Sequence, residues 1–250
     1  GVIIIGKKTG QVYYTRTVTT DNVRSTTVYA TDLNTKATRE IVKLPPATSV
    51  STVNADETLL AGIIDDKLAA AIKEGKPPAP PTQQGARADA YPGKGQMMEN
   101  RLAERRPLQL ITIDTKTGHV KTLLRGTDWY NHIQFSPTDP ALLMFCHEGP
   151  WHKVDRTWTI RTDGTQLTQI HRRTMLMEIE GHEWFSADGN WIWYDLQTPR
   201  SQVFWVAGYN DKSGERIWYH LKPSEWSVHF NVSPDGTLFA GDGGGPNSVA

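Results

Sequence analysis

Hydrophobic and polar positions along this chain form short apolar runs that are separated by polar turns. One kind of segment is an apolar strand, a turn built on Asp with Gly, Glu or Pro, and a second apolar strand, found at residues 49–65, 132–148, 182–197 and 229–243. The other kind is a strand, a turn rich in Asn, Asp, Thr, Lys and Gly, and another strand, found at residues 27–44, 108–124, 156–171 and 203–220. Turns of this composition between β-rich runs are typical of β-hairpins.

The two kinds of hairpin alternate along the chain, so that one of each makes a four-stranded antiparallel unit. The clearest units, counted from Phe135 to Phe185 to Val232, repeat at about fifty residues, which is a propeller-like period. The pattern therefore predicts an all-β fold, a β-propeller of which about four blades are visible. A β-sandwich is the alternative, but a sandwich need not repeat its turn chemistry in step.

The ends of the chain and one internal segment depart from this repeat. The chain begins inside an apolar run and ends before the partner hairpin of its last unit, so we expect one propeller domain over residues 1–250 that is incomplete at both ends. Residues 66–107 contain two helical runs, DKLAAAIKEG and MMENRLAERR, around a Pro/Gly-rich centre. We expect this insertion to lie outside the ring, either as a surface loop or as a flap that turns basic side chains toward an anionic ligand, namely Lys94, Arg101, Arg105 and Arg106.

Composition and charge narrow the function. The chain has 250 residues, 38% of them hydrophobic, and no formal net charge, which suits one β-rich domain and argues against general nucleic-acid binding. No apolar run approaches the length of a membrane span. The single cysteine, Cys146, excludes an internal disulfide, and its strand context favours a buried thiol over a nucleophile. Neither nucleic acid nor a membrane is therefore expected as a partner, and the oligomeric state stays open.

Five of the eight histidines lie at predicted strand ends: His132, His147, His152, His182 and His229. In a propeller these ends converge on one face around the central channel, and several imidazoles there suggest a transition metal. The alternative is that each histidine hydrogen-bonds a turn of its own blade, an interpretation that suits His132 and His152 best. Arg156, which follows the His-Glu turn directly after Asp155, either holds a carboxylate ligand in a bidentate manner or belongs to a structural Asp–Arg ion pair between strands.

Three blocks, MFCHEGPWHKVDRTW, GHEWFSADG and SVHFNVSPDGTLFAGDG, resemble in this order the oligogalacturonate lyases. The resemblance covers most of the chain outside residues 66–107. It implies a seven-bladed β-propeller of bacterial origin, cytoplasmic or periplasmic, that cleaves short galacturonate oligomers by metal-assisted β-elimination and releases 4,5-unsaturated uronates. It also implies Mn²⁺, or another divalent transition metal, as the cofactor.

The resemblance assigns roles to individual residues. It makes His182 the Brønsted base, Arg156 the charge stabiliser and His229 one metal ligand. The family's Gln-x-x-His-x-His motif, which would supply the remaining ligands, does not occur here, and we expect it beyond residue 250. Two departures from the family, Trp184-Phe185 in place of Phe-Trp and one residue fewer before Arg156, indicate a divergent subgroup. The other residues predicted to bind substrate are His147, Trp151, His152 and His132.

Elementary chemistry agrees with these roles. Removing the proton α to a uronate carboxylate builds negative charge there, which a divalent cation and Arg156 can stabilise. A base must be neutral, so we expect no carboxylate bonded closely to His182, with its neighbour Glu183 on the opposite face of the strand. Two alternatives are a TolB-like propeller that binds or acts as a scaffold without catalysis, and a lyase for another uronate oligosaccharide.

Overall fold

The computed structural model describes residues 3–20, 23–76 and 91–243 of the chain. In this part of the chain, the strands form four four-stranded antiparallel sheets and one two-stranded sheet, each in sequence order. The first two sheets are β1 (Ile3–Ile5), β2 (Gln11–Thr20), β3 (Val23–Asp32) and β4 (Thr38–Lys43), then β5 (Thr48–Val53), β6 (Leu59–Asp65), β7 (Leu108–Asp114) and β8 (Val120–Gly126). The remaining sheets are β9 (Trp129–Phe135), β10 (Leu142–Glu148), β11 (Thr157–Arg161) and β12 (Thr168–Gln169), then β13 (Ile179–Phe185), β14 (Trp191–Gln197), β15 (Phe204–Asn210) and β16 (Arg216–His220), and finally β17 (Phe230–Val232) and β18 (Phe239–Gly241).

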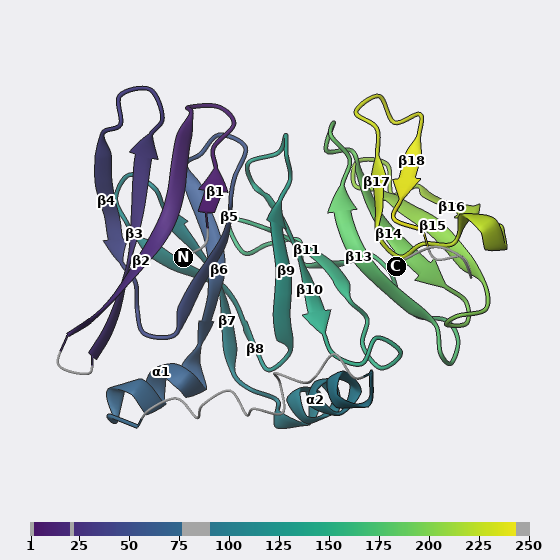
Figure 1. The fold of residues 1–250 in the computed structure, drawn as a ribbon, viewed down its shortest axis with the longest axis horizontal. Helices are drawn as coiled ribbons and strands as arrows, with labels where there is room; N and C mark the ends of the chain where they lie inside the picture. Colours follow the sequence, from purple (N-terminus) through teal and green to yellow (C-terminus); the bar gives the residue numbers. More distant parts are fainter. Residues whose placement is uncertain (1–2, 21–22, 77–90, 244–250) are drawn as a thin grey trace.

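The sheets are arranged as the blades of a β-propeller. Figure 1 shows them side by side in chain order, from the purple N-terminal sheet to the yellow C-terminal pair. The first strands of successive sheets contact one another, β1 against β5 and β5 against β9. Such contacts place the first strand of each blade on the inner side, where a propeller has its channel. The predicted four-stranded antiparallel blades are therefore confirmed, with four complete blades and a further hairpin among the described residues.

Apolar side chains between neighbouring blades hold the fold together. Leu60, Ile111 and Val28 pack in a cluster between the first and second sheets, and Phe145 belongs to another cluster between the second and third sheets. These strands are buried on both faces, which is why β10 reads as a continuous apolar run, LLMFC, in place of an alternating one. Burying one such large side chain contributes about 1.5–3 kcal/mol, so the inter-blade layers dominate stability.

Residues 66–107 leave one blade and return to it at neighbouring positions. The segment lies between β6 and β7, and the backbone N–H of Asp66 donates to the carbonyl of Pro107 at 3.1 Å. Helix α1 (Asp66–Lys73) is capped by Asp65, whose carboxylate accepts from the N–H of Leu68. Helix α2 (Tyr91–Glu104) begins inside the stretch predicted to be irregular. Pro92 does not prevent this, because proline is tolerated in the first turn of a helix. Both helices lie within the predicted insertion, and residues 77–90 of the predicted Pro/Gly-rich centre lie outside the described residues.

The insertion packs against the sheets, and its arginines are engaged there. Figure 1 shows both helices at the same end of the blades, below the ends of β6 and β10. Lys153, in the loop after β10, forms an ion pair with Glu99 of α2 at 2.7 Å. Each described arginine of the predicted flap has a protein partner: Arg101 lies over the Trp129 ring, Arg105 pairs with Asp128, and Arg106 pairs with Asp65. These contacts correct the expectation that the three face an anionic ligand; the Lys94 side chain lies outside the described residues.

One irregularity of the first strands bears on the site. The pairing of β9 with β10 shifts register between Met144 and Cys146, and that of β13 with β14 shifts after Gly181, so each first strand carries a β-bulge. The bulges contain His132 and His182, whose φ angles are 48° and 51°. A bulge bends its strand and redirects a side chain, and bulges are common next to functional sites.

Candidate active site

Three histidines occupy the same position in three successive blades. Each of them, His132, His182 and His229, is followed four residues later by a serine at the turn of the hairpin. The backbone N–H of that serine donates a hydrogen bond across the turn, to the carbonyl of Leu142, Trp191 and Leu238 respectively. The repeat therefore brings three imidazoles to equivalent places in their hairpins, within the first strand for His132 and His182 and directly before it for His229. The rings of His182 and His229 lie in contact, with centroids 4.3 Å apart.

Two of these imidazoles are bonded to an aspartate in the second strand of the hairpin. Nδ1 of His182 lies 2.7 Å from Oδ1 of Asp195, and Nδ1 of His229 lies 2.6 Å from Oδ2 of Asp242. The first contact corrects the expectation that no carboxylate is bonded closely to His182. Its cause is the register, which places Gly181 opposite Asp195 with the bulged His182 directly after it.

Asp195 is held in a nearly closed environment. Its residue is 1% exposed, and burial raises the pKa of its carboxyl, while the contact with His182 opposes that rise. Nε2 of Gln197 approaches its second oxygen at 3.5 Å. A buried carboxylate needs such partners, because leaving it unpaired would cost several kcal/mol.

Arg156 lies at the centre of a buried ion cluster. The residue is 0% exposed; Nη1 donates to Oε1 of Glu148 at 2.5 Å, and Nη2 lies 3.4 Å from Oε2 of Glu183. Burial by itself would lower the pKa of Arg156, but Cys146 and the two carboxylates outweigh it, and that pKa is raised. Arg156 therefore takes part in a structural ion pair between strands, with glutamates in place of the expected aspartate, while Asp155 pairs with Arg173 at 3.1 Å.

Trp151 joins this cluster to the histidines. The guanidinium of Arg156 lies 4.7 Å from the Trp151 ring centroid, and the His182 ring meets the same indole edge-on at 5.0 Å. The indole Nε1 donates to Oε1 of Glu148 at 3.0 Å. Gly181 makes room for the indole, because a Cβ there would lie 2.9 Å from the Trp151 ring. Arg156 and His182 are therefore neighbours through one aromatic ring.

His132 lies between two glutamates. Its ring nitrogens lie 3.5 Å from Glu148 and 3.8 Å from Glu183, and the side chain is 39% exposed. The contact with Glu148, aided by Glu183, raises the pKa of His132 against the opposing effect of burial. The same contacts, with Arg156 beside them, bring the pKa of Glu148 down to about 2 although burial alone would raise it.

Two places among the described residues have the side chains to hold a metal ion. Ligand atoms of His132, Cys146 and Glu148 come within 4.8 Å of one another. The guanidinium of Arg156 already contacts both Glu148 and Cys146, so a second cation there would be repelled and this set does not fit a metal. His229 does fit as one ligand, because its side chain is 61% exposed and Asp242 holds Nδ1, which leaves Nε2 for the ion.

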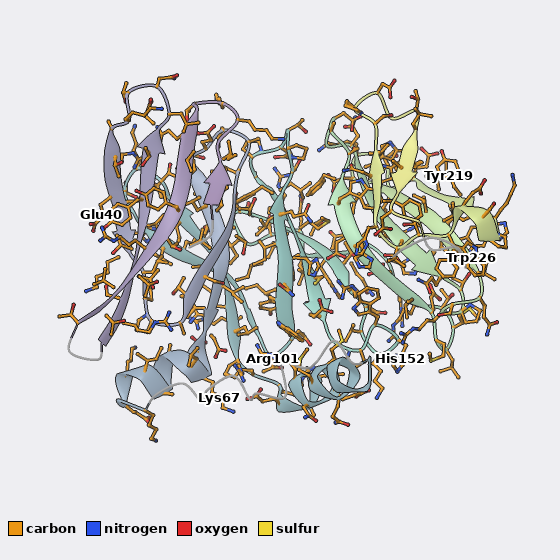
Figure 2. The ribbon with its side chains drawn as sticks, viewed as in Figure 1. Glu40, Lys67, Arg101, His152, Tyr219 and Trp226 are labelled. Atoms are coloured by element: carbon orange, nitrogen blue, oxygen red, sulfur yellow. The ribbon has the colours of Figure 1, made fainter. Side chains whose placement is uncertain are left out.

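The remaining predicted residues lie apart from this cluster. His147 stacks on Trp158 with centroids 4.9 Å apart, and burial lowers its pKa. It points away from Glu148, as adjacent strand residues do. His152 is half-buried in the loop after β10, and its carbonyl accepts from Arg173. Figure 2 shows His152 near α2, at the end of the blades where Arg101 also lies. Cys146 is fully buried with its pKa raised by desolvation, which confirms the buried thiol.

Comparison with known proteins identifies the family. A family model described as oligogalacturonate lyase matches residues 98–249. The chain belongs to the oligogalacturonate lyase family. An oligogalacturonide lyase of Pectobacterium atrosepticum is 30% identical to it over 140 residues, which are 54% of this chain and 34% of that protein. The chain thus spans about a third of the length of this curated relative.

Solved structures support the fold of this family member. A structure described as an oligogalacturonate lyase in complex with manganese aligns with a TM-score of 0.73 and 21% identity, over 98% of this chain and 59% of the other. TolB from Acinetobacter baumannii aligns with a TM-score of 0.51 and 12% identity, over 95% of this chain and 47% of TolB. No helix among the described residues is long and apolar enough to cross a membrane.

Proposed function

We propose that this member of the oligogalacturonate lyase family cleaves short galacturonate oligomers by β-elimination. The observation that carries the proposal is the pairing of His182 with His229, at the positions that the family resemblance makes the base and a metal ligand, with ring centroids 4.3 Å apart. Support also comes from the family model, which covers both residues.

In this mechanism His182 takes the C5 proton, which is acidic because it lies α to the uronate carboxylate. The electrons of the broken C5–H bond then form the C4–C5 double bond, and the glycosidic oxygen at C4 departs, takes a proton from water and leaves as a hydroxyl group. When bound, Mn²⁺ acts as a Lewis acid that stabilises negative charge on the carboxylate. His229 would be one of its protein ligands. No nucleophilic side chain is required, which agrees with the buried thiol of Cys146.

The other residues bind and orient the sugar. The Trp151 ring, half-buried beside His182, offers a flat surface for the apolar face of a pyranose. His132 offers a partly exposed imidazole, whose raised pKa favours the charged form, to a uronate carboxylate. Arg156 as charge stabiliser stays a prediction: in this structure Glu148 and Glu183 neutralise it, and its visible role is to hold Trp151.

The test is direct. Purified protein with Mn²⁺ is incubated with di- and trigalacturonate, and the ultraviolet absorbance of the conjugated 4,5-unsaturated product is followed. Product from galacturonate oligomers, but not from oligomers of other uronic acids, supports the proposal. Product formed only from oligomers of another uronic acid would show that galacturonate is not the substrate. Tight binding without product would favour the TolB-like alternative.

A further inference from the structure

The contact between His182 and Asp195 is built into the β-ladder of its blade. Gly181 pairs with Asp195 in the register of β13 with β14, and the bulge that follows turns the imidazole back onto that carboxylate. A Cβ on Gly181 would lie 3.3 Å from Oδ1 of Asp195, so glycine at this position also keeps the space clear. The register and the bulge therefore place the two side chains next to each other, and the burial of Asp195 restricts its movement.

The contact has a consequence for the chemistry of the imidazole. A neutral histidine carries its hydrogen on one ring nitrogen and its lone pair on the other, and only the nitrogen with the lone pair can accept a proton. An ionised aspartate accepts hydrogen bonds and donates none, so the nitrogen that faces it must carry the hydrogen. Nδ1 of His182 faces Asp195 at 2.7 Å, and within the described part of the chain Nε2 has no hydrogen-bond partner.

We propose that Asp195 is a positioning residue that fixes the tautomer of His182, with the hydrogen on Nδ1 and the lone pair on Nε2. The importance of this lone pair rests on the proposed function, in which Nε2 accepts the C5 proton. Free imidazole side chains favour the opposite tautomer, so without Asp195 the nitrogen that faces the substrate would already carry a hydrogen.

The next blade repeats the arrangement. His229 and Asp242 are separated by 13 residues, as are His182 and Asp195, and the contact again uses Nδ1. In this second pair the freed Nε2 is the atom available to a metal, and a carboxylate on the other nitrogen is the usual outer partner of a metal-binding histidine. Two adjacent blades thus use the same arrangement, an aspartate on Nδ1 that leaves Nε2 available, for the base and the metal ligand of the proposed reaction.

The tautomer can be measured directly by ¹⁵N NMR of the metal-free protein, since protonated and unprotonated ring nitrogens have well-separated shifts. The His182→Gln variant assigns the signals by their loss. In the wild-type chain we expect His182 to show hydrogen on Nδ1 and none on Nε2. In Asp195→Ala the two should exchange roles, or average between both nitrogens. The matched control Asp188→Asn, in the turn of the same hairpin, should leave the wild-type pattern unchanged.

Activity supplies a second readout. Asp195→Ala should lower kcat by roughly 100-fold or more, as expected when a general base holds its hydrogen on the wrong nitrogen, with little change in KM. Two NMR results would overturn the inference. The first is a wild-type His182 with its hydrogen on Nε2, since Asp195 would then be a neutral donor. The second is an Asp195→Ala variant in which the tautomer of His182 is unchanged. A wild-type protein without elimination activity would instead reject the proposed function, while the NMR result would still decide the role of Asp195.

Discussion

Replacing Glu148 with Gln is expected to make the stability of the fold less dependent on acid pH. Glu148 accepts from Arg156, from the indole of Trp151 and from the backbone of Gly149, and it contacts His132. These partners favour the ionised carboxylate, and they hold its pKa at about 2 against the ordinary 4.5 even though burial acts in the opposite direction. Glutamine has the same shape but no charge to titrate, so it resembles the protonated form.

The magnitude follows from linkage. The folded pKa is lower than the unfolded one, so the ionised carboxylate contributes stability that is fully present above pH 4.5 and is lost as pH falls through about 2. At about 1.4 kcal/mol per pH unit, the difference amounts to about 3 kcal/mol near pH 7. Because Glu148 is buried, screening by solvent reduces this little.

Urea unfolding of the wild-type and Glu148→Gln chains, followed by tryptophan fluorescence between pH 7 and pH 3, measures this difference. We expect the wild-type chain to be more stable by about 3 kcal/mol at pH 7, and the gap to narrow steadily below pH 4.5. The exposed Glu40, seen at the edge of the first sheet in Figure 2, provides the control: Glu40→Gln should track the wild-type chain. A gap for Glu148→Gln that stays constant down to pH 3 would show that the carboxylate contributes by shape and not by charge.

Three further variants test the site and the core. His182→Ala should lower product formation at least ~100-fold, which is the usual contribution of a general base. The circular dichroism spectrum and the amount of bound Mn²⁺ should be unchanged, and a turnover near that of the wild-type chain would show that His182 is not the base. His229→Ala should weaken Mn²⁺ binding in calorimetry at least tenfold, roughly the loss expected when a ligand is removed, and equal affinity would remove it from the ligand set. Phe145→Ala, in the fully buried layer where it meets Tyr130 edge-on, should cost about 3–5 kcal/mol in urea unfolding, whereas a loss below about 1 kcal/mol would mean that this layer collapses around the cavity.

The sequence predicts the blades well because hairpin chemistry is local. Turns such as Ser186-Ala187-Asp188-Gly189 fix their own hydrogen bonds, with Gly189 at a φ of 71°, and they repeat with the blade. The inserted helices between β6 and β7 are likewise visible in composition, although α2 begins earlier than predicted. The fold therefore follows from short-range signals that occur at a regular period.

The partners of the site residues could not be obtained in the same way, because they depend on contacts across strands. Asp155 precedes Arg156 in sequence, yet Glu148 and Glu183, from β10 and β13, hold the guanidinium. The sequence likewise does not predict that Asp195 contacts His182, because this contact depends on how β13 pairs with β14 and on the bulge in β13. A signal did exist: both blade histidines are followed after 13 residues by an aspartate.

One backbone position carries a histidine in three successive hairpins, yet the three imidazoles have different surroundings. His132, His182 and His229 start from the same place in the hairpin, and what differs is the carboxylate that each one meets. His132 lies between two glutamates that favour its charged form, so it suits an anionic sugar. His182 has a single buried aspartate on Nδ1, and His229 has an exposed one, so each presents Nε2. In the proposed mechanism, the acidic partners thus divide the three histidines into anion binder, base and metal ligand. Glu148 and Asp195 come from the second strand of the histidine's own blade, whereas Glu183 comes from the first strand of the next blade, so the division depends on the register of the strands and on the packing of neighbouring blades.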